Sequence, residues 1–249
     1  MVAHPARAYH SAIAGVTSKG DLYVVEGLRN AKGEGLAGNP NVLNVYGPDG
    51  DLKQEGVIPW MSAGAFEPRI DFAGNLYFTD AIMPRDPALM NLKKGALVRF
   101  GPTGGKFKLD ADKASYLVRR NEKDLSPTEL EGAHWVHYPA GCVSLEHCVC
   151  FASVFDLDGF GRSFVPDPFR KAIKVVDSAG NHMFWFGEPC NRDSRGPGSA
   201  LPTPDIPIGE PELVAVSDRS IYVFDSMNLR VVQAHLAASA EERLQVSRP

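Results

Sequence analysis

The sequence predicts an all-β fold, and three observations lead to that prediction. Glycine and proline are frequent, with 24 and 19 copies among 249 residues, which favours many turns and argues against a helical bundle. Apolar and polar residues alternate with the period of two that is typical of half-buried strands. One pattern of turn, strand and acid also recurs four times along the chain. Such a repeat indicates an architecture built from similar units.

Length and charge limit the class of protein. A chain of 249 residues can form one large all-β domain, so we expect a single domain over 1–249. The formal net charge of -4 gives no positive surface for nucleic acid, which we do not expect as a partner. No stretch approaches the roughly 18 to 20 apolar residues of a membrane span, and the amino terminus lacks a signal-peptide core. We expect a soluble protein, and a periplasmic or secreted location would require an export signal upstream of this chain.

The repeated pattern consists of a tight turn, an alternating strand and an acid. It occurs as KGDLYVVEG at 19–27, AGNLYFTDA at 73–81, FGRSFVPDP at 160–168 and DRSIYVFDS at 218–226. The acids that end these strands are 54, 87 and 58 residues apart. The chain therefore has a unit of about 55 residues that is interrupted once by an insertion of about 30.

Each copy of the pattern lies between further predicted strands. The short apolar stretches that precede the four copies are HSAIAGV, EPRIDF, CFASVFDL and PELVAVS. The strands that follow them lie at 41–52, 95–107, 172–187 and 228–236. In the first three of these, a glycine-bearing turn (GPDG, GPTGG or DSAG) reverses the chain into a fourth strand. Four antiparallel strands in this order form one blade of a β-propeller.

These units resemble NHL repeats, whose blades carry a glycine turn, L-Y-V-x-D and then N-x-R-V. The match is fullest at 214–236, good at 67–107 and looser at 9–52 and 151–187. The resemblance implies a β-propeller of four-stranded blades, of which this family usually has six. With four recognisable units, either the long interval hides a degenerate blade, the terminal strands complete each other's sheet, or the chain is part of a longer propeller. We favour a partial propeller or a covered edge over a complete ring.

The repeated acids and aromatic residues have structural and functional interpretations. The acids that end the strands are Glu26, Asp80, Asp167 and Asp225. Carboxylates that converge on a central channel are suited to calcium, but an acid in this position more often caps the following turn, and Asp225 can pair with Arg230. We favour capping. The aromatic residues at equivalent positions, for which we expect packing between blades, are Tyr23, Tyr77, Phe164 and Tyr222.

The region that departs most from the repeat is an irregular insertion at about 108–150. Six residues within it carry the side chains that zinc or copper prefers, and they are His134, His137, Cys142, His147, Cys148 and Cys150. Their spacing matches no common zinc module. The cysteines could instead form one or two disulfides, in which Cys148 or Cys150 pairs with Cys142 or Cys190, or remain free thiols. The run from His134 to Tyr138 also has the alternation of a half-buried strand.

A second irregular stretch lies at 186–213 and is rich in proline, glycine and serine. Its polar cluster consists of Asn191, Arg192, Asp193 and Arg195. Such a loop can bind an anion or cap a channel, although a plain connection is the simpler interpretation. The sequence contains no phosphate-binding loop, no G-x-S-x-G elbow, no H-E-x-x-H and no dinucleotide fingerprint. Serine hydrolase, zincin and Rossmann oxidoreductase functions therefore lose support.

Two functions remain. The first is a binding or scaffold module for protein–protein interaction, which docks a partner protein or a larger assembly through an exposed patch that includes Trp135 or Trp60. The second is a metal-dependent propeller enzyme, a lyase or a lactonase-like hydrolase, with zinc, copper or calcium near the Cys/His insertion. Resemblance to amidating lyases of this fold implies histidine ligands and a tyrosine base. No stretch aligns with such a site, so the candidates by chemistry alone are His134, His137, His147 and Tyr138.

Overall fold

The computed structural model describes residues 12–35, 41–61, 66–80, 95–108, 129–141 and 153–236. These residues form strands and turns, with no helix among them. Most of the strands belong to four antiparallel sheets, which we number 1 to 4 in chain order. The prediction of an all-β fold built from repeated sheets is therefore confirmed. Within the same residues, no helix has the length and apolar character needed to cross a membrane.

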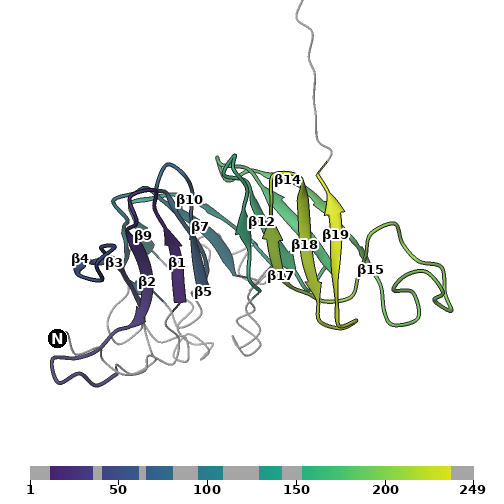
Figure 1. The fold of residues 1–249 in the computed structure, drawn as a ribbon, viewed down its shortest axis with the longest axis horizontal. Coiled ribbons are helices and arrows are strands. Elements are labelled where there is room, and N and C mark those ends of the chain that lie inside the picture. Colours follow the sequence, from purple (N-terminus) through teal and green to yellow (C-terminus); the bar gives the residue numbers. More distant parts are fainter. Residues whose placement is uncertain are drawn as a thin grey trace, which may run out of the picture.

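Sheets 1 to 3 have four strands each and sheet 4 has three (Figure 1). Sheet 1 consists of β1 (Ala12–Val16), β2 (Leu22–Gly27), β3 (Asn41–Tyr46) and β4 (Leu52–Met61). Sheet 2 consists of β5 (Phe66–Ile70), β6 (Leu76–Asp80), β7 (Ala96–Phe100) and β10 (Ala133–His137). Sheet 3 consists of β11 (Asp156–Leu157), β12 (Ser163–Asp167), β13 (Ala172–Val176) and β14 (His182–Phe186). Sheet 4 consists of β17 (Pro211–Val216), β18 (Ser220–Asp225) and β19 (Arg230–His235).

Two short pairs of strands lie outside the four sheets. β8 (Lys106–Lys108) pairs with β9 (Glu129–Glu131), and β15 (Glu188–Pro189) pairs in parallel with β16 (Pro207–Ile208). The expectation that the GPTGG turn leads into the fourth strand of its own sheet is wrong. The turn reverses the chain into β8, but the strand that pairs with β7 is β10, from within the predicted insertion. A local turn signal does not reveal this pairing, because the partner strand lies far along the chain.

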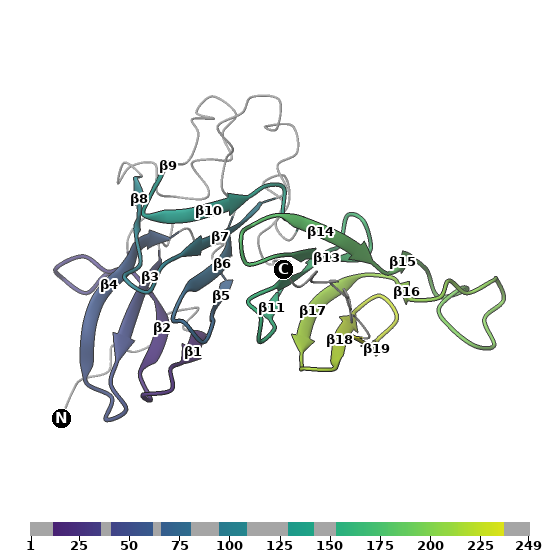
Figure 2. The ribbon, with the colours of Figure 1, turned by 90° about the horizontal axis from the view of Figure 1, so that it is seen from above.

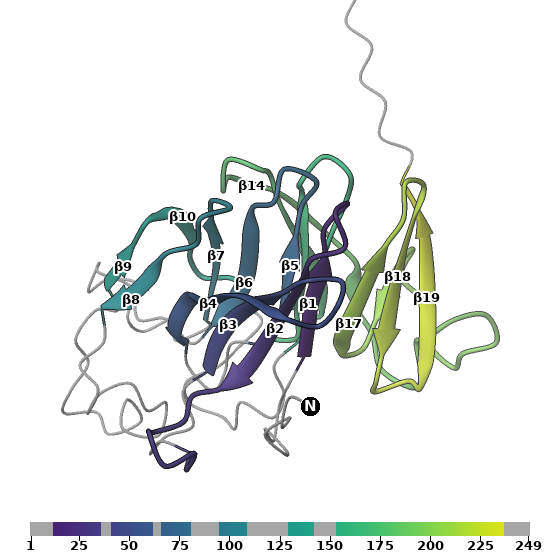
Figure 3. The ribbon, with the colours of Figure 1, turned by 60° about the vertical axis from the view of Figure 1, so that its left-hand side comes forward.

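The sheets stand side by side in chain order, with their first strands adjacent. β1 contacts β5, β5 contacts β11, and β11 contacts β17 (Figure 2). The later strands of each sheet lie progressively farther from this row, as β1 to β4 do in Figure 3. Neighbouring blades of a β-propeller have this arrangement. The second strand of every sheet is the repeated strand and acid of the sequence pattern.

Three turns between the first and second or the third and fourth strands share one local structure. In each, an aspartate accepts backbone N–H bonds from the residues two and four positions later, at 2.8–2.9 Å. These aspartates are Asp71, Asp158 and Asp177. The residue three positions later is a glycine with a φ of 81°, 73° or 89°, a conformation that side chains with a Cβ rarely adopt. The sequence pattern D-x-x-G therefore fixes these turns.

The core is formed where the sheets face one another. Sheets 1 and 2 bury one apolar cluster between them, which includes Leu43, Ile58, Phe78 and Phe100. The Phe78 and Phe100 rings are stacked with their centroids 5.6 Å apart. Sheets 3 and 4 bury a second cluster, which consists of Phe164, Ile173, Val175, Ile208, Val214, Ile221 and Val223. Apolar burial between neighbouring sheets is thus the main stabilising term at both contacts.

The contact between sheets 2 and 3 is more polar. Arg69 forms an ion pair with Asp156 at 3.3 Å, and Asp156 also accepts a bond from the backbone N–H of Val216 in sheet 4. The indole N–H of Trp135 donates to the carbonyl of Ser178 at 3.0 Å. These bonds specify how the middle sheets pair, because each would leave a polar group unsatisfied if the sheets separated.

Candidate functional site

The described part of the Cys/His segment forms a strand rather than a cluster. His134 and His137 both belong to β10, as the alternating pattern predicts. His134 lies on the exposed face of the strand beside Gly101, whereas His137 lies on the opposite, half-buried face. Nδ1 of His137 is 3.0 Å from the carbonyl oxygen of Gly180. The two histidines therefore point away from each other and do not share a site on β10.

Burial lowers the pKa of His137, and the nearby Lys174 charge acts in the same direction, although the bond to Gly180 opposes both. The other four candidate ligands, Cys142, His147, Cys148 and Cys150, lie outside the described residues. Over the ranges that the structure describes, no three His, Cys, Asp or Glu side chains gather as a metal site. A site for zinc, copper or calcium in this segment stays a prediction.

Trp135 packs between sheets and does not belong to an exposed patch. Its ring lies against the turn at Gly180, where an added Cβ would be 2.7 Å from Cδ2 of the indole. Trp135 also meets the buried Tyr77 ring edge-on, with the centroids 5.9 Å apart. The side chain of Trp60, the other tryptophan expected in a patch, lies outside the description. Trp185 on β14 is 40% exposed, and the Arg170 guanidinium stacks over its ring at 4.2 Å from the centroid.

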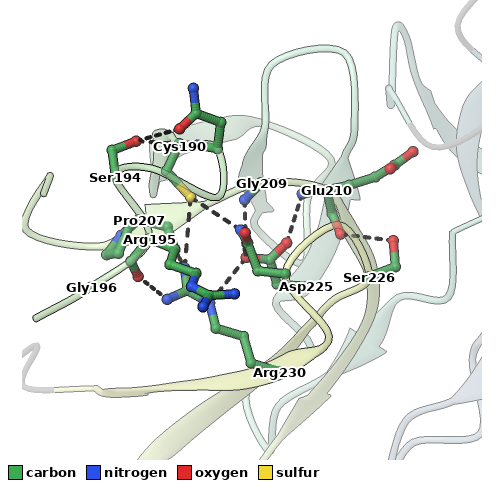
Figure 4. A network of polar contacts seen from close by, with 12 residues as sticks. Cys190, Ser194, Arg195, Gly196, Pro207, Gly209, Glu210, Asp225, Ser226 and Arg230 are labelled. Atoms are coloured by element: carbon green, nitrogen blue, oxygen red, sulfur yellow. Dashed lines mark hydrogen bonds and ion pairs between the residues drawn. The ribbon is translucent and has the colours of Figure 1, made fainter. Parts of the chain in front are cut away.

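A polar network surrounds the buried Asp225 at the end of β18 (Figure 4). The buried carboxylate accepts four hydrogen bonds. The donors are the backbone N–H groups of Gly209 and Glu210, the amide of Asn228 and Nε of Arg230, at 2.8–3.1 Å. The expected pairing of Asp225 with Arg230 is confirmed. The expectation that Asp225 caps the turn that follows it is wrong, because its backbone donors, Gly209 and Glu210, precede β17.

Arg230 and Cys190 connect this network to the 186–213 loop. The Arg230 guanidinium donates to the carbonyls of Pro207, at 2.6 Å, and of Arg195. Asn228 and Arg230 also donate to the sulfur of Cys190, at 3.4 and 3.6 Å (Figure 4). Cys190 is a buried free thiol, so the disulfide considered for it is not formed. Burial raises its pKa, and the neighbouring Asp225 charge adds to that effect.

Gly209 is the residue that allows the network to close. An added Cβ would lie 2.6 Å from Nδ2 of Asn228 and 2.8 Å from Oδ1 of Asp225, which is closer than real atoms approach. Only glycine therefore fits between β16 and the carboxylate.

The other repeated acids and aromatic residues have the predicted roles only in part. Asp167 accepts the backbone N–H of Arg170 at 3.0 Å and caps its turn, as expected. Glu26 instead accepts hydrogen bonds from Asn44 and Tyr46 across sheet 1, both at 2.6 Å. The side chain of Asp80 lies outside the description. Tyr77 and Phe164 pack between sheets, but Tyr222 is 39% exposed because no described sheet follows on its side.

The titration of Asp225 gives a testable pH dependence. Burial alone would raise its pKa, but the four hydrogen bonds, led by that from Asn228, outweigh burial and lower it. As the pH falls, Asp225 is protonated in the unfolded chain at a higher pH than in the folded chain. The stabilisation that the carboxylate provides is therefore complete above about pH 4 and is lost as the pH falls through the folded pKa. We expect Asp225→Asn to flatten the loss of stability below about pH 4, as measured by urea denaturation at several pH values. An unchanged slope would contradict the assignment.

A pocket opens beside this network. It has a volume of about 480 Å³ and is lined by Arg192, Asp193, Arg195, Met227, Asn228 and Leu229. The polar cluster expected in the 186–213 loop thus supplies three of the lining residues. Asn191, the fourth member of that cluster, holds the loop by accepting the backbone N–H of Asp193 at 2.8 Å.

No protein-family profile and no curated protein matches this sequence. Solved structures that resemble it include a protein assigned provisionally as a gluconolactonase, with 15% identity, a TM-score of 0.37, and coverage of 90% of this chain and 59% of that one. A second is regucalcin of Agrobacterium tumefaciens, a calcium-binding protein. It has 13% sequence identity and a TM-score of 0.37, and the match covers 86% of this chain and 52% of that one. A third is an auxiliary nutrient binding protein of Bacteroides ovatus. It has 12% sequence identity and a TM-score of 0.43, and the match covers 88% of this chain and 46% of that one. This chain therefore spans about half the length of the structures it matches.

Proposed function

We propose that the protein is a binding module that associates with a partner protein through the face of sheet 4 that no other described sheet covers. We call this surface the open face, and it consists of Leu213, Ala215, Tyr222, Phe224, Val231 and Gln233. These side chains form two cross-strand rows, since the pairing of β17, β18 and β19 aligns three of them in each row. One observation carries the proposal: Leu213, Phe224 and Val231 form an apolar row on the side of sheet 4 that lies opposite the face buried against sheet 3.

Side chains of the open face are much more exposed than those of the opposite face. Leu213 is 41% exposed, Tyr222 39% and Val231 62%, whereas Val214, Ile221 and Val223 on the opposite face are 1% exposed. Among the described sheets, the buried apolar faces pack against the face of a neighbouring sheet, as sheet 1 does against sheet 2 and sheet 3 against sheet 4. The largest apolar patch on a monomer is often functional, which makes the open face a candidate interaction site.

The chemistry of the open face favours a second copy of the chain as the partner. The open face carries no charge, so two copies can meet face to face in a symmetric contact without unpaired ions. The outer face of sheet 1 is a poor alternative, because it carries the Glu26 carboxylate and its bonds to Asn44 and Tyr46. The open face measures roughly 20 Å by 15 Å from strand rise and spacing. This area is below that of a stable dimer, so we expect weak, concentration-dependent association.

Substitution of Val231 tests this function. We expect Val231→Glu to weaken self-association by roughly a hundredfold, because the carboxylate would be buried without a partner. Val16→Glu is the matched control, since Val16 is 59% exposed on β1 in sheet 1. Sedimentation equilibrium on both variants and the wild-type chain measures the effect. If the three proteins associate equally, the open face is not the contact.

Two broader assignments complete the proposal. We propose that 1–249 forms one propeller-type domain and that its units are NHL repeats. The array of four sheets with adjacent first strands supports the first assignment. The glycine turns and the Asp225–Arg230 pair within the best-matching unit support the second.

A further inference from the structure

The base of the pocket beside Asp225 is held by hydrogen bonds. β15 and β16 bracket the loop that carries Arg192 and Arg195, and Arg230 donates to the carbonyls of Pro207 and Arg195. Within the loop, the backbone N–H of Leu201 donates to the carbonyl of Asp193 at 2.8 Å, and Thr203 donates to the carbonyl of Gly196 at 3.0 Å. These bonds hold the backbone from which the lining side chains project.

The charge in the pocket is available to a ligand. Among the described residues, neither the Arg192 nor the Arg195 guanidinium has a hydrogen-bond or ion-pair partner. The nearby Asp225 carboxylate does not neutralise them, because its four bonds go to other donors. Asp193 is the one carboxylate that lines the pocket. Two arginines and one aspartate leave a single net positive charge, which suits a monoanion.

A second feature calls for a hydrogen-bond donor. Asn228 lines the pocket and is 7% exposed, and its Oδ1 atom is buried without a hydrogen-bond partner. Its Nδ2 atom donates to Asp225 at 2.8 Å, which fixes the amide orientation, because a flipped amide would place Oδ1 against the carboxylate. A buried acceptor without a partner is costly and is usually satisfied by water or a ligand.

We propose that this pocket binds a small monocarboxylate that also carries a hydroxyl or amino donor. The ligand carboxylate pairs with Arg192 and Arg195, for which guanidinium geometry is well suited. Its donor group satisfies Oδ1 of Asn228. Met227 and Leu229 cover the apolar part of the ligand. This site is independent of the open face, so a failure of one proposal leaves the other standing.

Glycolate is the probe, because it is the smallest carboxylate with a hydroxyl donor, and acetate is the matched ligand without one. Titrations followed by amide chemical shifts in NMR spectra measure both affinities. We expect Arg192→Gln and Arg195→Gln each to weaken glycolate binding about tenfold, the loss of one charge-assisted bond. Arg219→Gln, which alters an exposed arginine on the β17–β18 turn, serves as the control.

Three results would contradict the proposal. If Arg219→Gln weakens glycolate binding as much as the pocket substitutions do, the effect comes from general surface charge. If glycolate and acetate bind with equal affinity, Asn228 does not bind the ligand's donor group. Glycolate affinity that survives both pocket substitutions would also refute the site. We expect Val231→Glu to bind glycolate as the wild-type chain does, which separates this test from that of the open face.

Discussion

Replacing Asp225 with alanine is expected to lower the free energy of unfolding by about 3–5 kcal/mol at neutral pH. The carboxylate is fully buried and accepts bonds from two backbone N–H groups, Asn228 and Arg230. Its removal leaves the Arg230 charge, which is only partly exposed, without its anion, and it leaves three neutral donors without an acceptor. Urea denaturation measures the change.

Asp205→Ala is the control for this prediction. Asp205 lies on the exposed part of the same loop, and we expect its removal to change the stability by less than about 0.5 kcal/mol. Equal effects of the two substitutions would show that the network around Asp225 does not hold sheet 4 to the loop.

Phe78→Ala is expected to cost about 3–5 kcal/mol of stability. Phe78 is 0% exposed and stacks on Phe100 in the cluster between sheets 1 and 2, so its removal leaves a cavity that the surrounding strands cannot fill. Chemical denaturation again gives the value.

Phe72→Ala removes the same ring from a site that is 96% exposed in the neighbouring turn, and we expect a change within about 0.5 kcal/mol. A small effect at Phe78 would mean that sheets 1 and 2 do not pack as described.

The sequence predicted the repeated strands well because their signals are local. A glycine turn, alternation and a terminal acid lie within nine residues, and they become the second strand of each sheet. The glycine turns themselves were predicted, including DSAG at 177–180, but the hydrogen bonds that Asp71, Asp158 and Asp177 form within them were not. Aspartate hydrogen bonds to its own turn are a local effect, so that pattern was available.

Features that depend on distant residues could not be predicted. The pairing of β10 with β7 joins Ala133 to Phe100, and no local signal encodes it. Tyr222 occupies the same repeat position as Tyr77, yet only Tyr77 is buried, because burial depends on whether a further sheet follows. The Cys190 thiol meets Asn228 and Arg230 only through the folding of the 186–213 loop. The Asp225–Arg230 pair was predictable, since both residues flank one turn.

We propose that the open face of sheet 4 binds a second sheet face. Light scattering tests this most directly, by measuring the molar mass of the purified wild-type chain over a range of concentrations. We expect a mass that rises with concentration from 27.0 kDa toward twice that value. A mass that stays at 27.0 kDa at every concentration would contradict it.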